Sequence, residues 1–440
     1  MMMYKKYDAY KDSGVQWLAD IPNDWEVVRF RDICTFSKGL NITKENLQDT
    51  GIPCVNYGEV HSKYGFEVSP ERNELKCVSE DYLKNSPKSL LAYGDFIFAD
   101  TSEDIDGSGN FTYLNSHNLT FAGYHTVIVR PKPYINVRYL AYVFDSLSFR
   151  HQVRTAVKGV KVYSITKAIL KDTAVWLPNV DRQYEIAQFL DQKTTQIDQA
   201  IAIKEQQITL LNERKQIVIQ QAVTKGLDPN VKMKDSGVEW IGEIPEHWEV
   251  RRSKFIFGQR KELARKNDIQ LSATQAYGVI PQEEYEKRTG KSVVKISMHL
   301  EKRKRVHLDD FVISMRSFQG GLERAWANGC IRSSYVVLKA LMDINPTYYA
   351  YLFKTPTYIK ALQNTSNFIR DGQDLNFNNF AQVDLFLVPK TEQDCIVNFI
   401  TDKLGNFDQH IDLLSKQIQK LKEYKTTLIN DAVTGKIKVA

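Results

Sequence analysis

The residues with the clearest chemical meaning follow an apolar stretch in the second half of the chain. Arg316, Ser317 and Gln319 come directly after Asp310 to Ser314, which has the composition of a strand, and before Gly320-Gly321. Arginine can donate two hydrogen bonds to the edge of guanine, and glutamine can bind adenine in a similar bidentate way. Because a strand end followed by two glycines favours an exposed loop, these residues are candidates for contacting bases.

Other polar residues could serve the same chemistry. Asp100 to Glu103 follows a strand-like stretch in the first half, and its acidic groups would suit a cytosine amino group or simply face water. Lys302 to Arg305 is a compact basic run, either a phosphate contact or a solvated turn. The full set of candidate nucleic-acid-binding residues is Lys38, Asn41, Asn56, Tyr57, Thr101, Ser102, His125, Lys302, Arg303, Arg305, Arg316, Ser317, Gln319, Arg324 and Arg332.

Catalytic motifs are absent from the sequence. The tail of a phosphate-binding loop occurs at Gly290-Lys291-Ser292, but Tyr285 stands where the first glycine is required. Neither NPPF nor DPPY, the strings of adenine methylases, is present. Asp104-Ile105-Asp106-Gly107 lacks the remaining ligands of a calcium loop. We therefore expect no catalysis and no bound metal or cofactor in this chain.

The composition is that of an ordinary globular protein with a mildly basic balance. Hydrophobic residues make up 42%, charged residues 25%, and the net charge is +6. The apolar runs are too short for a bilayer and the first ten residues lack the apolar core of a signal peptide, so we expect a cytoplasmic protein without a membrane partner. The 5 cysteines are scattered, which favours reduced and packed thiols.

An internal duplication organises the whole chain. Lys11 to Phe30 and Lys234 to Ser253 align without gaps and share twelve of twenty residues. Ile135 to Phe144 and Ile344 to Phe353 share six of ten, in the same order along the chain. Between these blocks the two copies differ in sequence. The pattern therefore predicts two units with a common fold and different functional segments.

Each copy ends in a long amphipathic helix. Tyr184 to Ala222 and Cys395 to Ala432 carry apolar residues three and four apart, a seam interrupted at the matching positions Lys215 and Lys425. We expect the two helices to pack antiparallel as a spacer between the copies. The predicted seam comprises Leu190, Ile197, Ile201, Ile208, Leu211, Val218, Ile400, Phe407, Ile411, Leu414, Ile418, Leu421 and Leu428.

Short strands and amphipathic helices precede each long helix. Asp95 to Ala99 and Thr126 to Arg130 have strand composition, and Tyr139 to Val157 and Pro346 to Leu362 have helical periodicity. The fold class is therefore α+β. Asp309 replaces Gly94 before the second Asp-Phe strand, which predicts a different turn there.

The order of these motifs resembles the specificity subunits of type I restriction-modification enzymes. The opener SG-x-x-W-x-x-x-IP-x-x-W, the Asp-Phe strand, a proline before a short acidic and glutamine-containing stretch, and the long helix all occur twice. The resemblance implies two target recognition domains that each bind half of a gapped double-stranded DNA site. It also implies two methyltransferase subunits holding S-adenosylmethionine, and restriction subunits holding ATP and magnesium.

We assign residues 1–180 to the first recognition domain, 181–226 to the first spacer helix, 227–390 to the second recognition domain and 391–440 to the second helix. These assignments combine the duplication with the resemblance. A different hypothesis stays open, in which the chain is a coiled-coil adaptor that binds proteins and not DNA.

Overall fold

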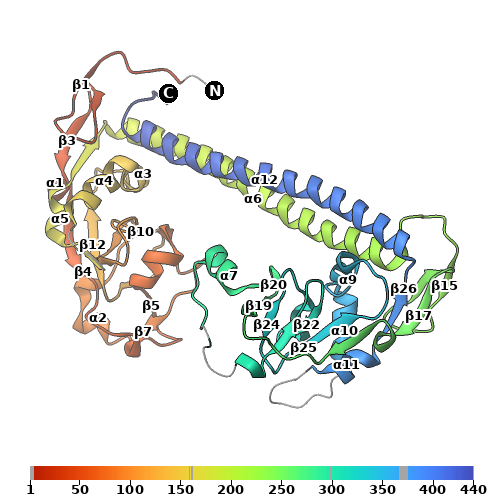
Figure 1. Ribbon diagram of the computed structural model, residues 1–440. Helices are drawn as coiled ribbons and strands as arrows, with labels where there is room; N and C mark the ends of the chain where they lie inside the picture. Colours follow the sequence, from red (N-terminus) through yellow and green to blue (C-terminus); the bar gives the residue numbers. More distant parts are fainter. Residues whose placement is uncertain are drawn as a thin grey trace. The chain divides into compact units, whose positions relative to one another are not determined.

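The computed structural model describes residues 4–157, 159, 162–294, 296, 300–365 and 375–439. The chain forms two compact units: unit 1 combines Met1–Lys204 with Lys416–Ala440, and unit 2 is Glu205–Ser415. The long helices α6 (Val180–Lys225) and α12 (Lys390–Val433) each contribute one segment to each unit (Figure 1). Each unit is therefore an α+β domain with a helix pair, as the pattern of strands and amphipathic helices predicts.

A five-stranded sheet forms the centre of unit 1, in the order β4-β12-β8-β10-β6. Its described strands pair antiparallel except for β10 and β6, which run parallel. The strands of unit 1 are β1 (Tyr10–Asp12), β2 (Asp20–Pro22), β3 (Glu26–Arg29), β4 (Cys34–Lys38), β5 (Ile52–Val55), β6 (Phe66–Val68), β7 (Cys77–Val78), β8 (Phe96–Ala99), β9 (Thr101–Ser102), β10 (Phe111–Leu114), β11 (Phe121–Ala122), β12 (Thr126–Pro131), β13 (Tyr163–Ser164) and β14 (Ala174–Leu177). Its helices besides the long pair are α1 (Phe30–Ile33), α2 (Tyr82–Asn85), α3 (Val137–Asp145), α4 (Leu147–Ala156) and α5 (Lys167–Asp172).

Unit 2 has a four-stranded sheet in the order β18-β25-β22-β23, and its described pairs are antiparallel. Its strands are β15 (Met233–Asp235), β16 (Glu243–Pro245), β17 (Glu249–Arg252), β18 (Phe257–Arg260), β19 (Leu271–Thr274), β20 (Gly278–Pro281), β21 (Lys304–Val306), β22 (Phe311–Ile313), β23 (Glu323–Arg324), β24 (Gly329–Ile331), β25 (Val336–Ala340) and β26 (Asp384–Leu387). Its helices besides the long pair are α7 (Gln282–Thr289), α8 (Ser317–Gly320), α9 (Pro346–Leu352), α10 (Pro356–Asn364) and α11 (Phe377–Gln382).

The duplicated sequence blocks form one repeated frame. Three adjacent strands of the main sheet have the same order, β4-β12-β8 in unit 1 and β18-β25-β22 in unit 2. The two-stranded sheets β3-β14 and β17-β26 also correspond. The second tryptophans of the two repeated openers, Trp25 and Trp248, are fully buried. They therefore serve packing, and burial of such large side chains stabilises each unit.

The single amphipathic helices expected at 139–157 and 346–362 are wrong, because each is broken in two. Ser146 ends α3, and its hydroxyl accepts a hydrogen bond from the backbone N–H of Phe149 to start α4. Thr355 plays the same part before α10, with Pro356 at the first helical position. Side-chain caps and a proline that lacks an N–H favour a new helix start over continuation.

The seam of the long helices is buried or half-buried at every predicted position. In unit 1, Lys425 of α12 pairs with Asp198 of α6 at 2.7 Å, and in unit 2 Lys215 of α6 pairs with Asp408 of α12. Higher residue numbers on one helix face lower numbers on the other. The helices therefore run antiparallel within each unit, as their seams predict.

The cysteines are free thiols; Cys34, Cys54, Cys77 and Cys330 are buried, whereas Cys395 on α12 is exposed. Among the described helices none is both long and apolar enough to span a bilayer.

Candidate nucleic-acid interface

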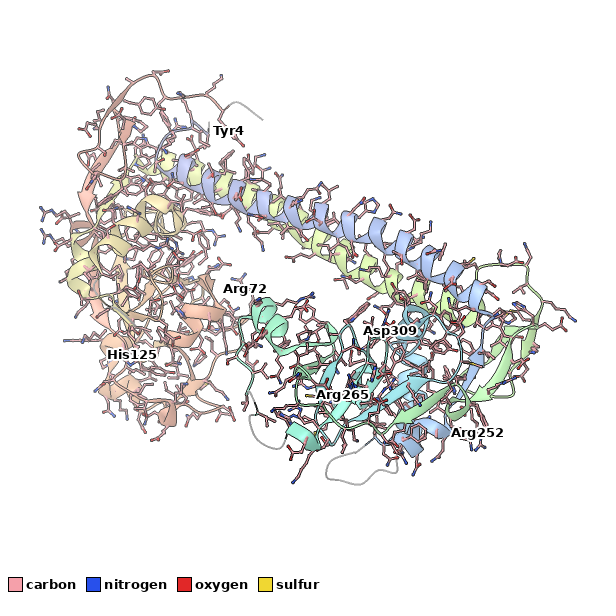
Figure 2. The ribbon with its side chains drawn as sticks, in the orientation of Figure 1. Tyr4, Arg72, His125, Arg252, Arg265 and Asp309 are labelled. Carbon is pink, nitrogen blue, oxygen red and sulfur yellow. The ribbon has the colours of Figure 1, made fainter. Side chains whose placement is uncertain are left out.

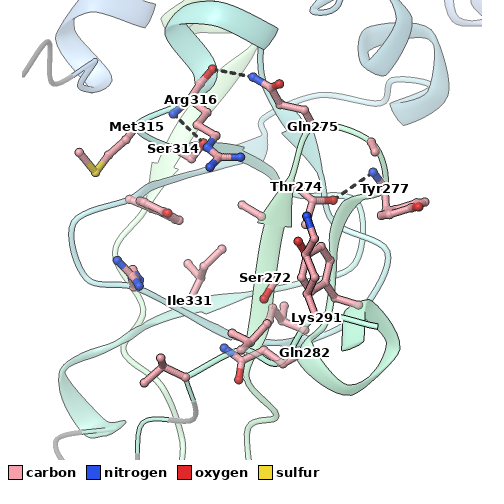
Figure 3. Close-up of a pocket in the computed structure, with 18 of the residues that line it drawn as sticks. Ser272, Thr274, Gln275, Tyr277, Gln282, Lys291, Ser314, Met315, Arg316 and Ile331 are labelled. Atoms are coloured by element: carbon pink, nitrogen blue, oxygen red, sulfur yellow. Dashed lines mark hydrogen bonds between the residues drawn. The ribbon is translucent and has the colours of Figure 1, made fainter. Parts of the chain in front are cut away.

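A concave pocket with a volume of about 1240 Å³ lies within unit 2 (Figure 3). One wall is β19 with the turn that follows it, and a second is α7 with the segment after it. The ends of β22 and β24 complete the pocket, and the cluster around Leu271 and Ile331 packs beneath it. Segments that range from Leu271 to Tyr335 in the sequence therefore meet around one cavity.

The pocket is cationic and carries no compensating acid. Lys291, Arg303, Arg316 and Arg332 line it, and the described lining residues include neither aspartate nor glutamate. Lys291, Arg316 and Arg332 are exposed, and their charged groups have no hydrogen-bond or ion-pair partner among the described residues. A surface of this kind attracts polyanions such as nucleic acid.

Other arginines of unit 2 are held by carboxylates. Arg260 makes two hydrogen bonds to Asp310, at 2.7 and 2.9 Å, and Arg324 binds Asp309 at 2.8 Å. Arg305 lies 3.5 Å from Asp268. The unpaired cations of the pocket are thus distinct from these structural arginines.

The loop that carries Arg316 is fixed by short-range hydrogen bonds. The Arg316 N–H donates to Ser314 Oγ at 3.3 Å, and Gln275 Nε2 donates to the Arg316 carbonyl at 3.2 Å (Figure 3). Ser317 is buried, and its hydroxyl accepts from the Ser314 N–H at 2.9 Å. The backbone is therefore constrained while the guanidinium of Arg316 stays free.

Aromatic and amide side chains share the pocket with the cations. Tyr277, Tyr285 and Tyr335 are half-buried in its lining, and Gln275 and Gln319 are exposed. Tyrosine rings offer stacking faces and glutamine offers paired donor and acceptor groups, both of which nucleic-acid-binding surfaces use.

The sequence-predicted residues of unit 2 fall into three groups. Arg303, Arg316, Gln319 and Arg332 come together in the pocket, although Arg303 is only 5% exposed. Lys302 is exposed but does not line the pocket. The remaining three have structural partners instead: Ser317 caps the loop, and Arg305 and Arg324 pair with aspartates.

In unit 1 several predicted residues gather at the ends of β8 and β12. His125 is exposed on the surface of the unit (Figure 2), and its ring binds Asp100 at 3.2 Å, next to Thr101. Tyr57 stacks on His61 with ring centroids 5.1 Å apart. Burial raises the pKa of Tyr57, and the nearby carboxylates of Glu103, Asp104 and Asp100 raise it further.

Two predicted residues of unit 1 are inaccessible. Asn56 is 1% exposed and donates to the Cys54 carbonyl at 3.2 Å, and Ser102 is fully buried with its hydroxyl donating to the Asp104 carbonyl. In this conformation neither side chain reaches the surface. Lys38, which faces Val127 across the sheet, and Asn41 are both exposed.

Sequence reasoning missed most of the pocket lining. Gln275, Tyr277, Tyr285 and Tyr335 were not predicted, and Lys291 was considered only as part of a failed phosphate loop. Single tyrosines and glutamines outside a motif give no signal of their own. The pairing of β19 with β20, the position of α7 and the segment after β24 bring them into the same pocket as Arg316.

Known proteins share both the sequence pattern and the fold of this chain. Residues 22–213 match the family model of the type I restriction modification DNA specificity domain. The fold, with two similar α+β units and two long helices, is also that of the HsdS subunit from Thermoanaerobacter tengcongensis, with a TM-score of 0.52 at 13% identity over 95% of this chain and 98% of that one. A second solved chain, from a study of complex assembly in the type I R-M system, gives a TM-score of 0.66 at 14% identity over 94% and 98%.

One relative is similar over its full length. This is a Methanocaldococcus jannaschii protein, provisionally named type I restriction enzyme MjaX specificity subunit, which is 23% identical over 100% of this chain and 99% of its own. Residues 22–213 therefore carry the type I restriction modification DNA specificity domain, and the whole chain is similar to a specificity subunit of this kind.

Proposed function

We propose that this chain reads a bipartite, gapped site on double-stranded DNA, with one half-site bound by each unit. The observation that carries the proposal is a repeated frame with unlike contents. The same three adjacent strands hold Arg316 at the rim of a cationic pocket in unit 2 and the acidic stretch around Thr101 in unit 1. Base-contacting loops of different chemistry, held on equivalent strands, suit a DNA target whose two halves differ in sequence.

The chain would act without catalysis of its own. Two methyltransferase subunits would dock on it and methylate adenine with S-adenosylmethionine, flipping the base out of the duplex. Where the host has them, two restriction subunits would supply the ATP- and magnesium-dependent motor. The two similar ends of the helix pair support binding of two methyltransferase subunits, one at each end. A chromosomal substrate implies a cytoplasmic location.

The assignment of 1–180 and 227–390 as recognition domains, with 181–226 and 391–440 as spacer helices, belongs to the same proposal. Packing supports it in part. The end of α12 is buried against unit 1 through Val433, and the end of α6 against unit 2 through Val223.

The test uses the chain in complex with the methyltransferase subunit of its host. Bacteria expressing the complex should acquire adenine methylation in a split sequence motif, with half-sites about 34 Å apart, one turn of the duplex. Footprinting should show protection of the same motif. Absence of any sequence-selective methylation or protection would favour the alternative, a coiled-coil adaptor for proteins.

A domain exchange tests the division of labour. Residues 31–176 replaced by those of a relative should change one half of the methylated motif and leave the other half intact. The physical reason is that the exchanged segment contains the sheet of unit 1 and none of unit 2. A change in both halves would contradict the modular arrangement.

A further inference from the structure

Arg316 differs from three arginines that lie on the strands of unit 2. It is exposed at the rim of the acid-free pocket, and its guanidinium has no partner among the described residues. Arg260, Arg305 and Arg324 lie on strands in the same unit, but each is held by an aspartate. Arginines that stabilise the fold are paired here, so an unpaired arginine in a cavity is available to a ligand.

The main chain around Arg316 makes more hydrogen bonds than that around Arg332. Its N–H and its carbonyl are both bonded to side chains, Ser314 Oγ and Gln275 Nε2, and its carbonyl also accepts from the N–H of Gln319 and of Gly320 at 3.0 Å. Among the described residues, the Arg332 carbonyl accepts a single hydrogen bond, from the Tyr335 N–H at 3.1 Å. A donor on a fixed backbone loses less entropy on binding and discriminates better between ligands.

The hydrogen-bonding geometry of the Arg316 guanidinium indicates which base it would contact. Its parallel N–H groups match two acceptors side by side, and of the base edges in the major groove guanine presents such a pair, O6 and N7. The aligned residue of unit 1, Thr101, sits among Asp100, Glu103 and Asp104, whose carboxylates would repel those acceptors.

We propose that Arg316 is a specificity-determining residue, which donates two hydrogen bonds to a guanine in the half-site of unit 2. Lys291 and Arg332, which also line the pocket, neutralise phosphates beside it. The proposal rests on the DNA-reading function proposed above and adds the base that this side chain recognises.

The first experiment maps methylated adenines in cells that carry the complex with Arg316→Gln, Arg316→Thr or no change. With the unchanged chain, one half of the motif should contain an obligatory guanine. Either substitution should relax that single position, with the guanine preference falling roughly 5- to 150-fold. The other half of the motif should stay as it is, which shows that the variant folds and assembles.

Arg252→Gln is the matched control, because Arg252 is an exposed arginine of unit 2 on β17, outside the pocket (Figure 2). It should leave the motif unchanged. An Arg316→Gln complex with the motif of the unchanged protein would overturn the proposal. So would a loss of binding that is equal for all sequences, because that result describes a phosphate contact.

A second experiment removes one acceptor from the DNA. Duplexes with 7-deazaguanine at the mapped position lack N7, so they should bind the unchanged complex roughly 5-fold or more weakly. They should bind the Arg316→Gln complex as well as normal duplexes do. Equal sensitivity of both complexes would refute the contact. If the unchanged complex has no motif at all, the proposed function fails instead, so the two failures are distinct.

Discussion

Two equivalent turns show how different residues support one backbone conformation. Gly94 has a φ of +82° and Asp309 a φ of +69°, so both lie in the left-handed region, and the expectation of a different turn in unit 2 is wrong. In each turn the next residue, Asp95 or Asp310, accepts a backbone N–H at 2.8 Å. Aspartate tolerates the left-handed region better than most residues, and Arg324 holds the Asp309 carboxylate.

We predict that Gly94→Ala destabilises unit 1 by about 1–2 kcal/mol, since a side chain in the left-handed region costs about that much. The added Cβ would also lie 2.8 Å from Val137 Cγ2. Urea unfolding measures the change. Gly58→Ala is the control, because Gly58 has a φ of −62° and nothing within 4 Å of an added Cβ; a similar loss in both variants would contradict the steric argument.

Glu323 makes stability depend on pH. Burial raises the pKa of Glu323 above its ordinary value of 4.5, although Lys354 acts in the opposite direction. A raised pKa in the folded state favours folding below the unfolded pKa, and this contribution is lost as the pH rises through the folded pKa. Glu323→Gln should therefore stabilise unit 2 at pH 8 relative to the unchanged chain.

At pH 4 the same variant should show little difference, because the native carboxyl is then largely protonated. Lys354 keeps its hydrogen bond to the Gly320 carbonyl at 2.8 Å, so the substitution leaves its ammonium partnered. Thermal unfolding at both pH values measures the effect. A stability gain that is equal at pH 4 and pH 8 would rule out the titration of Glu323 as its cause.

At the residue scale, sequence reasoning found the cations of the pocket better than their surroundings. Arg316 and Gln319 were predictable because a strand and two glycines bracket them. Tyr285 was not, because it reaches the pocket from a separate helix. Asn56 and Ser102 have side chains suited to base contact, but hydrogen bonds hold them inside the fold, and burial of that kind leaves no mark in local sequence.

The long helices are the elements that the sequence specifies best. Lys425–Asp198 and Lys215–Asp408 occupy equivalent positions of the two copies, so each interruption of the apolar seam has a partner on the other helix. The heptad pattern alone could not predict these pairs, because it does not fix which residue of α6 faces which residue of α12. The helix breaks at Ser146 and Thr355 were not predicted. Apolar periodicity continues through both positions, but side-chain capping starts a new helix there.

A charge exchange tests this register. Asp198→Lys places two cations opposite each other in unit 1 and should destabilise it by about 1 kcal/mol, and Lys425→Asp added to it should restore most of the loss. Denaturant midpoints report both changes. Glu213→Lys, at an exposed position of α6, should have little effect. If the double variant is no better than the single one, the pair does not fix the register.

On the scale of the whole molecule, each long helix serves both copies. The duplication was evident in the sequence, but the division into compact units was not. Unit 1 needs the last segment of the chain, since Trp176 donates to the Val433 carbonyl and Ser148 Oγ donates to Asn430 Oδ1 at 3.0 Å. In unit 2, Tyr348 donates to the Val223 carbonyl at the end of α6.

Removal of residues 416–440 should therefore unfold unit 1, although the rest of that unit, residues 1–204, lies at the other end of the sequence. Leu428, Ile429 and Val433 are each at most 3% exposed, and burial of such a side chain contributes ~1.5–3 kcal/mol. Their combined loss is comparable with the total stability of a domain, about 5–15 kcal/mol. Unit 2 keeps all of its own residues in the shortened chain.

Hydrogen exchange of the shortened chain distinguishes the two units within one sample. Amides of β8 in unit 1 should lose protection, whereas those of the equivalent strand β22 in unit 2 should keep it. The internal comparison excludes a general effect of truncation on solubility or sample handling. Equal loss in both strands would mean that the units fold as one cooperative body, and protection retained in β8 would mean that residues 1–204 suffice for unit 1.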